Sequence, residues 1–173
     1  MATKPIRRIV TGHNSAGRSV ILHDGPAPNA SPDSNSTLLW LTDRAPASNR
    51  GNEDVAPAGK RVPVPPPKNG TVFRVVDFLP DSAGHSGATL NPSASQIQVD
   101  PERSKRHHGF HQTNSVDYAI VLEGEIWAMM DEGETLMKAG DVLIQRGTFH
   151  AWSNRSSQPC RVAFILVDAE PLN

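Results

Sequence analysis

Hydrophobic residues after residue 70 fall in short runs of β-branched, aliphatic and aromatic side chains. Each run is bounded by glycine or by polar turn residues, for example Asp131-Glu132-Gly133 and Asn154-Arg155-Ser156-Ser157. No run shows the roughly 3.6-residue apolar period, with capping residues, that predicts a helix. The pattern predicts strands over residues 72–78, 118–122, 125–130, 141–144 and 161–167. Short strands without helices are typical of an all-β sandwich or barrel.

The first seventy residues have a different composition and a weaker strand pattern. Ten of the fifteen prolines lie before residue 71, and the run 63–67 must be extended because each ring fixes φ and removes a donor. Short strands are predicted over 8–11, 19–22 and 36–41, whereas 43–70 offers almost nothing to build a core with. We therefore divide the chain into an N-terminal arm of strands and proline-rich loop, 1–70, which packs on a barrel, 71–173.

The strands of the arm are too short to form a core of their own. We expect them to pair with the edge of a barrel, that of a neighbouring subunit, which would also cover an exposed sheet edge. The sequence thus predicts a homodimer.

The composition of the chain excludes several classes of binding partner and site. Lys and Arg number 17 against 18 Asp and Glu, so the chain has no basic excess for a nucleic acid to contact. The single cysteine, Cys160, excludes an internal disulfide framework and a multi-cysteine zinc site. No apolar run is long enough to cross a membrane, and the first residues lack the apolar run of a signal peptide. We expect a soluble cytoplasmic protein with a small-molecule partner.

Two of the seven histidines have surroundings that favour a chemical role. Six residues of extended strand would separate His111 from Asp117 by about 20 Å, so they share a site only if the chain turns between them. Asn114-Ser115 supplies turn residues, which would place His111, Thr113 and Asp117 around one cavity. His150 falls on a second strand. The other five lie in polar or basic loops and are interpreted as surface residues: His13, His23, His85, His107 and His108.

The segment around His150 resembles the second sequence motif of the cupins. That motif reads Gly, about five residues, Pro-x-Gly, two residues, His, three residues, Asn. Gly140, Gly147, His150 and Asn154 match it, although Gln145 stands where proline is usual and the first spacing is one residue shorter. The run Gln-Arg-Gly-Thr-Phe-His-Ala-Trp over 145–152 is similar to single-domain cupins found in secondary-metabolite clusters.

The first cupin motif is degraded in this chain. His111, Asp117 and Gly124 take the spacing of its first His, its Glu and its closing Gly. Thr113 replaces the second His, and Lys105 stands where the leading Gly belongs. The resemblance covers about residues 71–168 and implies a double-stranded β-helix, the cupin jelly-roll barrel, with a cavity at its mouth.

The resemblance also implies one divalent metal, which in cupins is Fe, Mn, Zn or Ni. Its ligands here would be His111, Asp117 and His150, similar to a facial triad, with Thr113 at the lost fourth place. A metal-free interpretation remains open, in which the histidines move a proton, Asp117 orients one imidazole and Thr113 donates to a carbonyl or carboxylate.

The candidate walls of the substrate pocket are aromatic, with ordinary core packing as the alternative for each, and suit an aromatic or polyketide-like ligand: Trp40, Trp127, Phe149, Trp152 and Phe164. The leading hypothesis is a lyase or isomerase that carries out decarboxylation, dehydration or a related proton transfer, with His111, Asp117, His150 and Thr113 as catalytic residues. The alternatives are an Fe(II)-dependent dioxygenase and a non-catalytic cupin that binds a small ligand.

Overall fold

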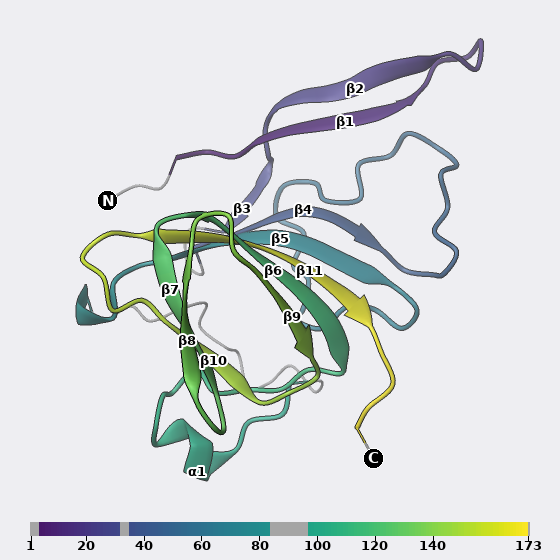
Figure 1. Cartoon of the computed structure of the whole chain (residues 1–173). Coiled ribbons are helices and arrows are strands. Elements are labelled where there is room, and N and C mark those ends of the chain that lie inside the picture. Colours follow the sequence, from purple (N-terminus) through teal and green to yellow (C-terminus); the bar gives the residue numbers. More distant parts are fainter. Residues whose placement is uncertain (1–3, 32–34, 84–96, 173) are drawn as a thin grey trace.

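The computed structural model describes residues 4–31, 35–83 and 97–172, and strands dominate them. Its larger sheet has the order β3-β4-β5-β11-β6-β9, and a smaller sheet has the order β10-β7-β8. The two sheets curve around one interior (Figure 1), so the predicted all-β jelly-roll barrel is confirmed. The barrel strands are β5 (Thr71–Phe78), β6 (Ser115–Glu123), β7 (Glu125–Met130), β8 (Glu134–Lys138), β9 (Val142–Arg146), β10 (His150–Ser153) and β11 (Cys160–Asp168).

Alternation along the strands separates the interior from the surface. On β6, Ser115, Asp117, Ala119 and Val121 are buried, and the residues between them are partly or fully exposed. The main core is built from such inward positions on both sheets, and it includes Val76, Phe78, Ala119, Val121, Ile126, Ala128, Met137, Trp152, Cys160 and Val162. Because side chains alternate in a strand, one face of each strand lines this interior.

Three of the described β-strands and α-helices were not predicted. Strand β8 is an edge strand with mostly exposed residues, so its alternation is weak in the sequence. The chain turns from β7 into β8 at Gly133, whose φ of +85° suits glycine. The others are short: helix α1 (Pro101–Ser104) and strand β3 (Asn29–Ser31), which falls in a stretch interpreted as loop. No helix of the described ranges is long and apolar enough to span a membrane.

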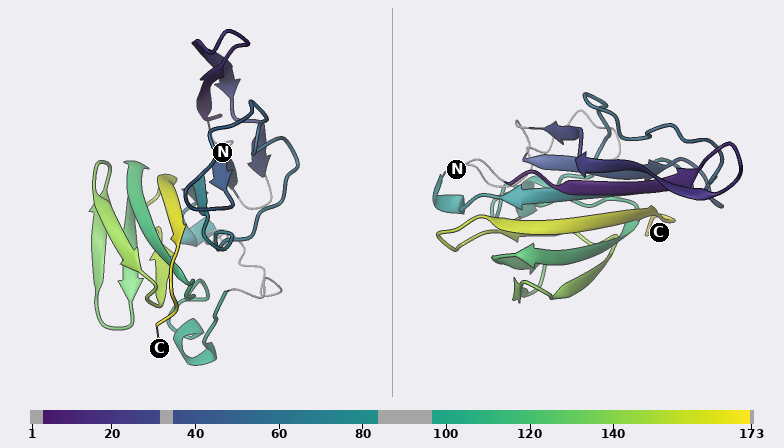
Figure 2. Two further views of the ribbon diagram at one scale, coloured as in Figure 1. Left: turned by 90° about the vertical axis from the view of Figure 1, so that its right-hand side faces the viewer. Right: turned by 90° about the horizontal axis from the view of Figure 1, so that it is seen from above.

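The arm contributes to the barrel sheet itself. Strand β4 (Ser36–Thr42) pairs antiparallel with β5 of the same chain and buries Leu38 and Leu39. Strands β1 (Arg7–His13) and β2 (Ser19–Pro26) form a separate hairpin that projects from the body (Figure 2). The larger sheet therefore includes residues from both sides of the expected boundary at residue 70.

Segment 43–70 is held mainly by polar contacts. Arg8 is buried against Asp54 and also donates to the Leu39 carbonyl at 3.1 Å. Asn29 Nδ2 donates to the carbonyls of Pro57 and Lys60, both at 2.8 Å. The segment also buries a few apolar side chains, Ala56, Pro65 and Pro66, so its contribution to the core is small.

The contact between β4 and the barrel should dominate the stability that the arm contributes. Replacing buried Leu39 with Asp removes apolar burial and places a charge in the cluster with Val75 and Ala163. We expect Leu39→Asp to lower the melting temperature by about 10 °C or more in a thermal unfolding scan. Leu172→Asp is the control, since Leu172 is 67% exposed and should keep the wild-type melting temperature. Equal melting temperatures would contradict this packing.

Candidate functional site

Two imidazoles lie side by side at the start of β10. His111 and His150 form an isolated antiparallel bridge, in which each backbone N–H donates to the other residue's carbonyl at 3.0 Å. Their ring centroids are 4.3 Å apart with planes tilted by 51°, and both residues are buried. The sequence prediction that these two histidines converge is consistent with this geometry. Asn114 lies at a bend between His111 and β6, where a turn was expected.

Each ring is oriented by a nearby carbonyl. His111 Nδ1 lies 2.8 Å from the Gly109 oxygen, and His150 Nδ1 lies 2.9 Å from the Thr148 oxygen. A carbonyl oxygen only accepts hydrogen bonds, so the proton of each neutral ring resides on Nδ1. Each Nε2 consequently keeps a free lone pair.

Both rings are neutral at physiological pH. Burial lowers the pKa of His111 below its ordinary value, and the hydrogen bond to Gly109 opposes that shift. Burial, and then the neighbouring His111, lower the pKa of His150 to about 3. The site therefore presents two neutral nitrogen bases in an apolar interior.

Asp117 belongs to a different part of the interior. It lies on β6 directly opposite Gln145 of β9 and has a buried Oδ1 without a hydrogen-bond partner. Burial raises the pKa of Asp117 to about 6, while the Ser115 hydroxyl and the charge of Arg74 oppose the shift. The Thr113 hydroxyl is directed to Ser115, with the two oxygens 2.8 Å apart.

The expected metal triad of His111, Asp117 and His150 is not assembled. Within the described ranges, no three His, Cys, Asp or Glu side chains form a group that could hold a metal ion. Two imidazoles with Nδ1 hydrogen-bonded and Nε2 free are the usual form of histidine ligands. A catalytic metal usually has three protein ligands, so the described donors do not fit a metal centre of that kind.

Two of the five candidate pocket aromatics lie beside the histidines. The Trp152 ring centroid is 6.1 Å from that of His150 and 5.3 Å from that of Phe164. These two rings form an apolar wall next to the imidazole pair. Both also contact Phe78 of the core.

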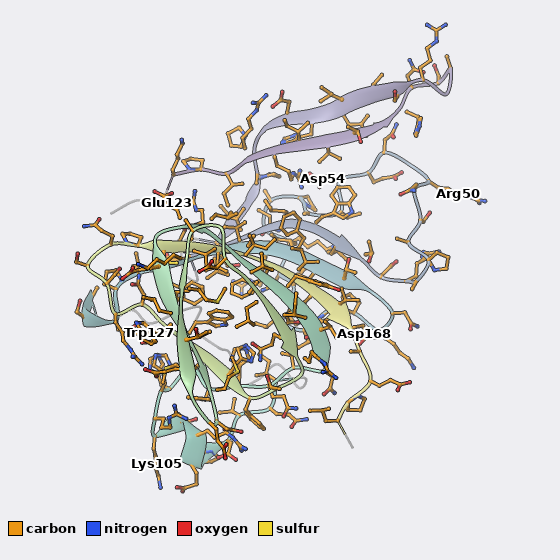
Figure 3. All side chains as sticks on the ribbon, in the orientation of Figure 1. Arg50, Asp54, Lys105, Glu123, Trp127 and Asp168 are labelled. Atoms are coloured by element: carbon orange, nitrogen blue, oxygen red, sulfur yellow. The ribbon has the colours of Figure 1, made fainter. Side chains whose placement is uncertain are left out.

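The other three aromatics lie elsewhere. Trp127 faces outward from β7, between the inward Ile126 and Ala128, and Arg155 stacks on it at 4.7 Å (Figure 3). Phe149 packs in a second cluster with Phe110, Met129 and Ala151. Trp40 pairs with Phe73 on the face of β5 that packs toward the arm. Trp127 therefore lies on the outer face of β7, and the structure does not place it beside the imidazole pair.

Sequence analysis missed two polar residues of the interior, Arg74 and Gln145. Arg74 lies on the β5 face that also carries Val76 and Phe78, and burial lowers its pKa to about 10. Gln145 is 2% exposed, and its Nε2 donates to the carbonyl and hydroxyl of Thr148. The signal for Arg74 was a charge in the middle of an apolar strand. Conversely, His85, interpreted as a surface residue, lies outside the described residues.

Comparison with known proteins identifies related chains. The family described as "Cupin domain" matches residues 95–167. "Cupin-domain-containing oxidoreductase fogC" of Aspergillus ruber is 30% identical, with 93% of this chain and 71% of that protein covered. "Phomopsin biosynthesis cluster protein C'" of Diaporthe leptostromiformis is also 30% identical, with 95% and 79% covered. A solved Cupin 2 conserved barrel domain protein from Salinispora arenicola covers 82% of each chain at 14% identity, with a TM-score of 0.41.

The buried imidazoles should make stability depend on pH. His150 has a pKa near 3 in the fold and an ordinary value of 6.5, so its contribution is full above pH 6.5 and is lost as the pH falls toward 3. One linked proton changes the free energy of unfolding by about 1.4 kcal/mol per pH unit. We expect His150→Gln to reduce the acid-side slope by about this amount in urea unfolding at pH 4 to 6.5.

Asp117 acts in the opposite direction. Its pKa is raised to about 6, so it favours the fold as the pH falls below that value. The same contribution is present in wild type and in His150→Gln, and the difference between their slopes isolates His150. His13→Gln, at an exposed position of the hairpin, is the control and should keep the wild-type slope. An identical slope in all three proteins would mean that His150 is not buried in neutral form.

Proposed function

This chain belongs to the cupin family, and we propose that it is an enzyme of secondary metabolism that transfers a proton on a small molecule bound inside the barrel. The reaction would be of the lyase or isomerase type. One observation carries the proposal: two buried, neutral imidazoles each have Nδ1 hydrogen-bonded to a carbonyl and Nε2 free. A relative named for a biosynthesis cluster supports the metabolic setting.

The imidazole pair suits a base that holds a proton briefly. A free Nε2 accepts a proton from a C–H or O–H bond of the substrate. Burial and the second imidazole both disfavour the imidazolium that results, since His111 lowers the pKa of His150. The proton therefore passes readily to another substrate atom, as dehydration or isomerisation requires. Trp152 and Phe164 keep this space apolar and restrict water.

Asp117 and Thr113 have supporting roles in the proposal. The Asp117 carboxyl, with a pKa near 6, exchanges its proton close to neutral pH. The Thr113 hydroxyl is positioned by Ser115 and faces the interior as a hydrogen-bond donor or acceptor. Both contact the substrate's polar groups in this scheme, while the histidines carry the proton.

Two alternatives remain from the sequence. The Aspergillus ruber relative is named an oxidoreductase, which supports the second hypothesis, an Fe(II)-dependent dioxygenase. The third hypothesis is a cupin that binds a small ligand without converting it. Whether conversion requires oxygen, and whether it continues with a chelator, distinguishes these three functions.

The proton-transfer proposal is tested with a panel of aromatic 3-hydroxy and 3-oxo acids in D₂O, under argon and with EDTA. We expect conversion, or deuterium incorporation at carbon, to persist in these conditions when followed by mass spectrometry. His150→Gln should lower the rate by about 100-fold or more, because it removes a base, and His13→Gln should not. Conversion that requires oxygen and stops with EDTA would support the dioxygenase. Binding without conversion would support the ligand-binding alternative.

We also propose a homodimer in which the β1–β2 hairpin of one protomer covers β9 of the other. Ile9 and Ile21 on the hairpin are 51% and 62% exposed, and Val142 and Ile144 on β9 are 57% and 51% exposed. β9 is an unpaired edge of the larger sheet, and an isolated two-stranded hairpin is marginally stable in water. Joining the two would bury both apolar surfaces.

Light scattering after size exclusion tests this assembly. We expect wild type to have the mass of a dimer at micromolar concentration. Ile21→Lys and Ile144→Lys should each give monomers, because each places a charge in the joined surface. Lys105→Glu, at an exposed position next to α1 and outside both strands, should remain dimeric. A monodisperse wild-type monomer would contradict the proposal.

A further inference from the structure

Arg74 lies on the inward face of β5, which also carries Val76 and Phe78 of the main core. It lies opposite Phe164 in the pairing of β5 with β11. The Phe164 ring contacts Trp152, and the Trp152 ring contacts His150. Arg74 and His150 thus belong to one continuous interior surface with the two aromatic rings between them.

Arg74 differs from Arg161 and Arg8 in its partners. Arg161 forms a two-pronged ion pair with Asp77 at 2.6 and 2.8 Å, and Arg8 is paired with Asp54. Arg74 Nη2 instead donates to the backbone carbonyls of Pro63 and Val64, at 2.5 and 3.5 Å. No carboxylate of the described residues lies within 4 Å of it.

The unused donors of Arg74 point to an anionic ligand. Its Nε is buried and has no hydrogen-bond partner in the part of the chain that the structure describes. A desolvated guanidinium that contacts no carboxylate or phosphate is costly, because neutral carbonyls compensate its charge only in part. The proline-rich segment engages Nη2, which leaves Nε and Nη1 to donate charge-assisted hydrogen bonds to a carboxylate.

Two hydrogen-bond acceptors complete this group. Asp117 and Gln145 lie directly opposite each other on β6 and β9, and Asp117 Oδ1 and Gln145 Oε1 are buried without a hydrogen-bond partner among the described residues. The Gln145 amide is oriented because its Nε2 donates to Thr148 at 3.0 and 2.6 Å. Asp117 also acts electrostatically on Arg74. Two unpaired acceptors beside an unpaired donor are complementary to a ligand that carries both a hydroxyl and a carboxylate.

We propose that the substrate is a hydroxy acid, whose carboxylate is bound by Arg74 and whose one hydroxyl hydrogen is shared between the acceptors Asp117 Oδ1 and Gln145 Oε1. The inference rests on the proposed function and narrows it. An ion pair with Arg74 stabilises the carboxylate that a decarboxylase would have to remove. A reaction that keeps the carboxylate, such as dehydration of a 3-hydroxy acid, fits this arrangement better.

The dehydration balances with the groups present. The proton of C2 passes to a histidine Nε2, and the electrons of that C–H bond form the C2–C3 double bond. The C3–O bond breaks, and the departing hydroxide takes a proton from the imidazolium. The products are an unsaturated acid, still held by Arg74, and one water.

Calorimetric binding of three matched probes tests the carboxylate site: 3-hydroxy-3-phenylpropanoate, its amide, and 3-phenylpropanoate. We expect wild type to bind the hydroxy acid about 10-fold or more tightly than the amide, because charge-assisted bonds to Arg74 are lost in the amide. Arg74→Gln should abolish this preference and leave amide affinity unchanged. Gln145→Leu should reduce the preference for the hydroxy acid over 3-phenylpropanoate. Arg7→Gln, on the exposed hairpin, is the control and should behave as wild type.

Circular dichroism establishes that each variant is folded. Should Arg74→Gln fail to fold, Arg74→Lys keeps the charge without the planar fork, and we expect a reduced preference for the acid over the amide. A folded Arg74 variant with the wild-type preference, or a wild type that does not distinguish acid from amide, would overturn the inference. This binding test is independent of the proton-transfer proposal. If Arg74 governs binding but His150→Gln keeps full conversion, the carboxylate site stands and the proton-transfer proposal fails.

Discussion

The site depends on one pair of backbone hydrogen bonds. His111 and His150 belong to segments 39 positions apart in the chain, and each donates its backbone N–H to the other's carbonyl at 3.0 Å. This bridge brings the two rings together, and the carbonyls of Gly109 and Thr148 then set their orientation. In both cases the carbonyl lies two residues before the histidine, so a local turn on each segment produces the same tautomer. The two carbonyl contacts thus give both imidazoles the same tautomer and the same free nitrogen.

The polar residues of the interior separate into two groups. The imidazole pair lies beside Trp152 and Phe164, and Arg74, Asp117 and Gln145 form a second group on the larger sheet. This separation explains why the two imidazoles and the carboxylate do not form one metal-binding cluster within the described residues. An apolar wall joins the two groups, so one bound molecule can contact both.

The arm affects the site through the proline-rich segment. Its strand β4 extends the larger sheet beyond β5, and the chain then passes over β5 to reach residues 63–67. There, the Pro63 carbonyl accepts a hydrogen bond from Arg74, and Pro65 and Pro66 are buried. A segment with little core-forming capacity therefore has a specific task, which is to hold one end of a guanidinium inside the barrel.

The sequence by itself determined the fold class and most barrel strands, because period-2 alternation and glycine turns are local properties. It also singled out His111 and His150, which the structure brings together. Only the tertiary structure decided which residues share a space. It placed Trp127 outside and Arg74 inside, and it assigned Asp117 to Gln145 and Arg74. The reason is physical: pairing of strands distant in sequence sets which side chains meet, and no local pattern records that register.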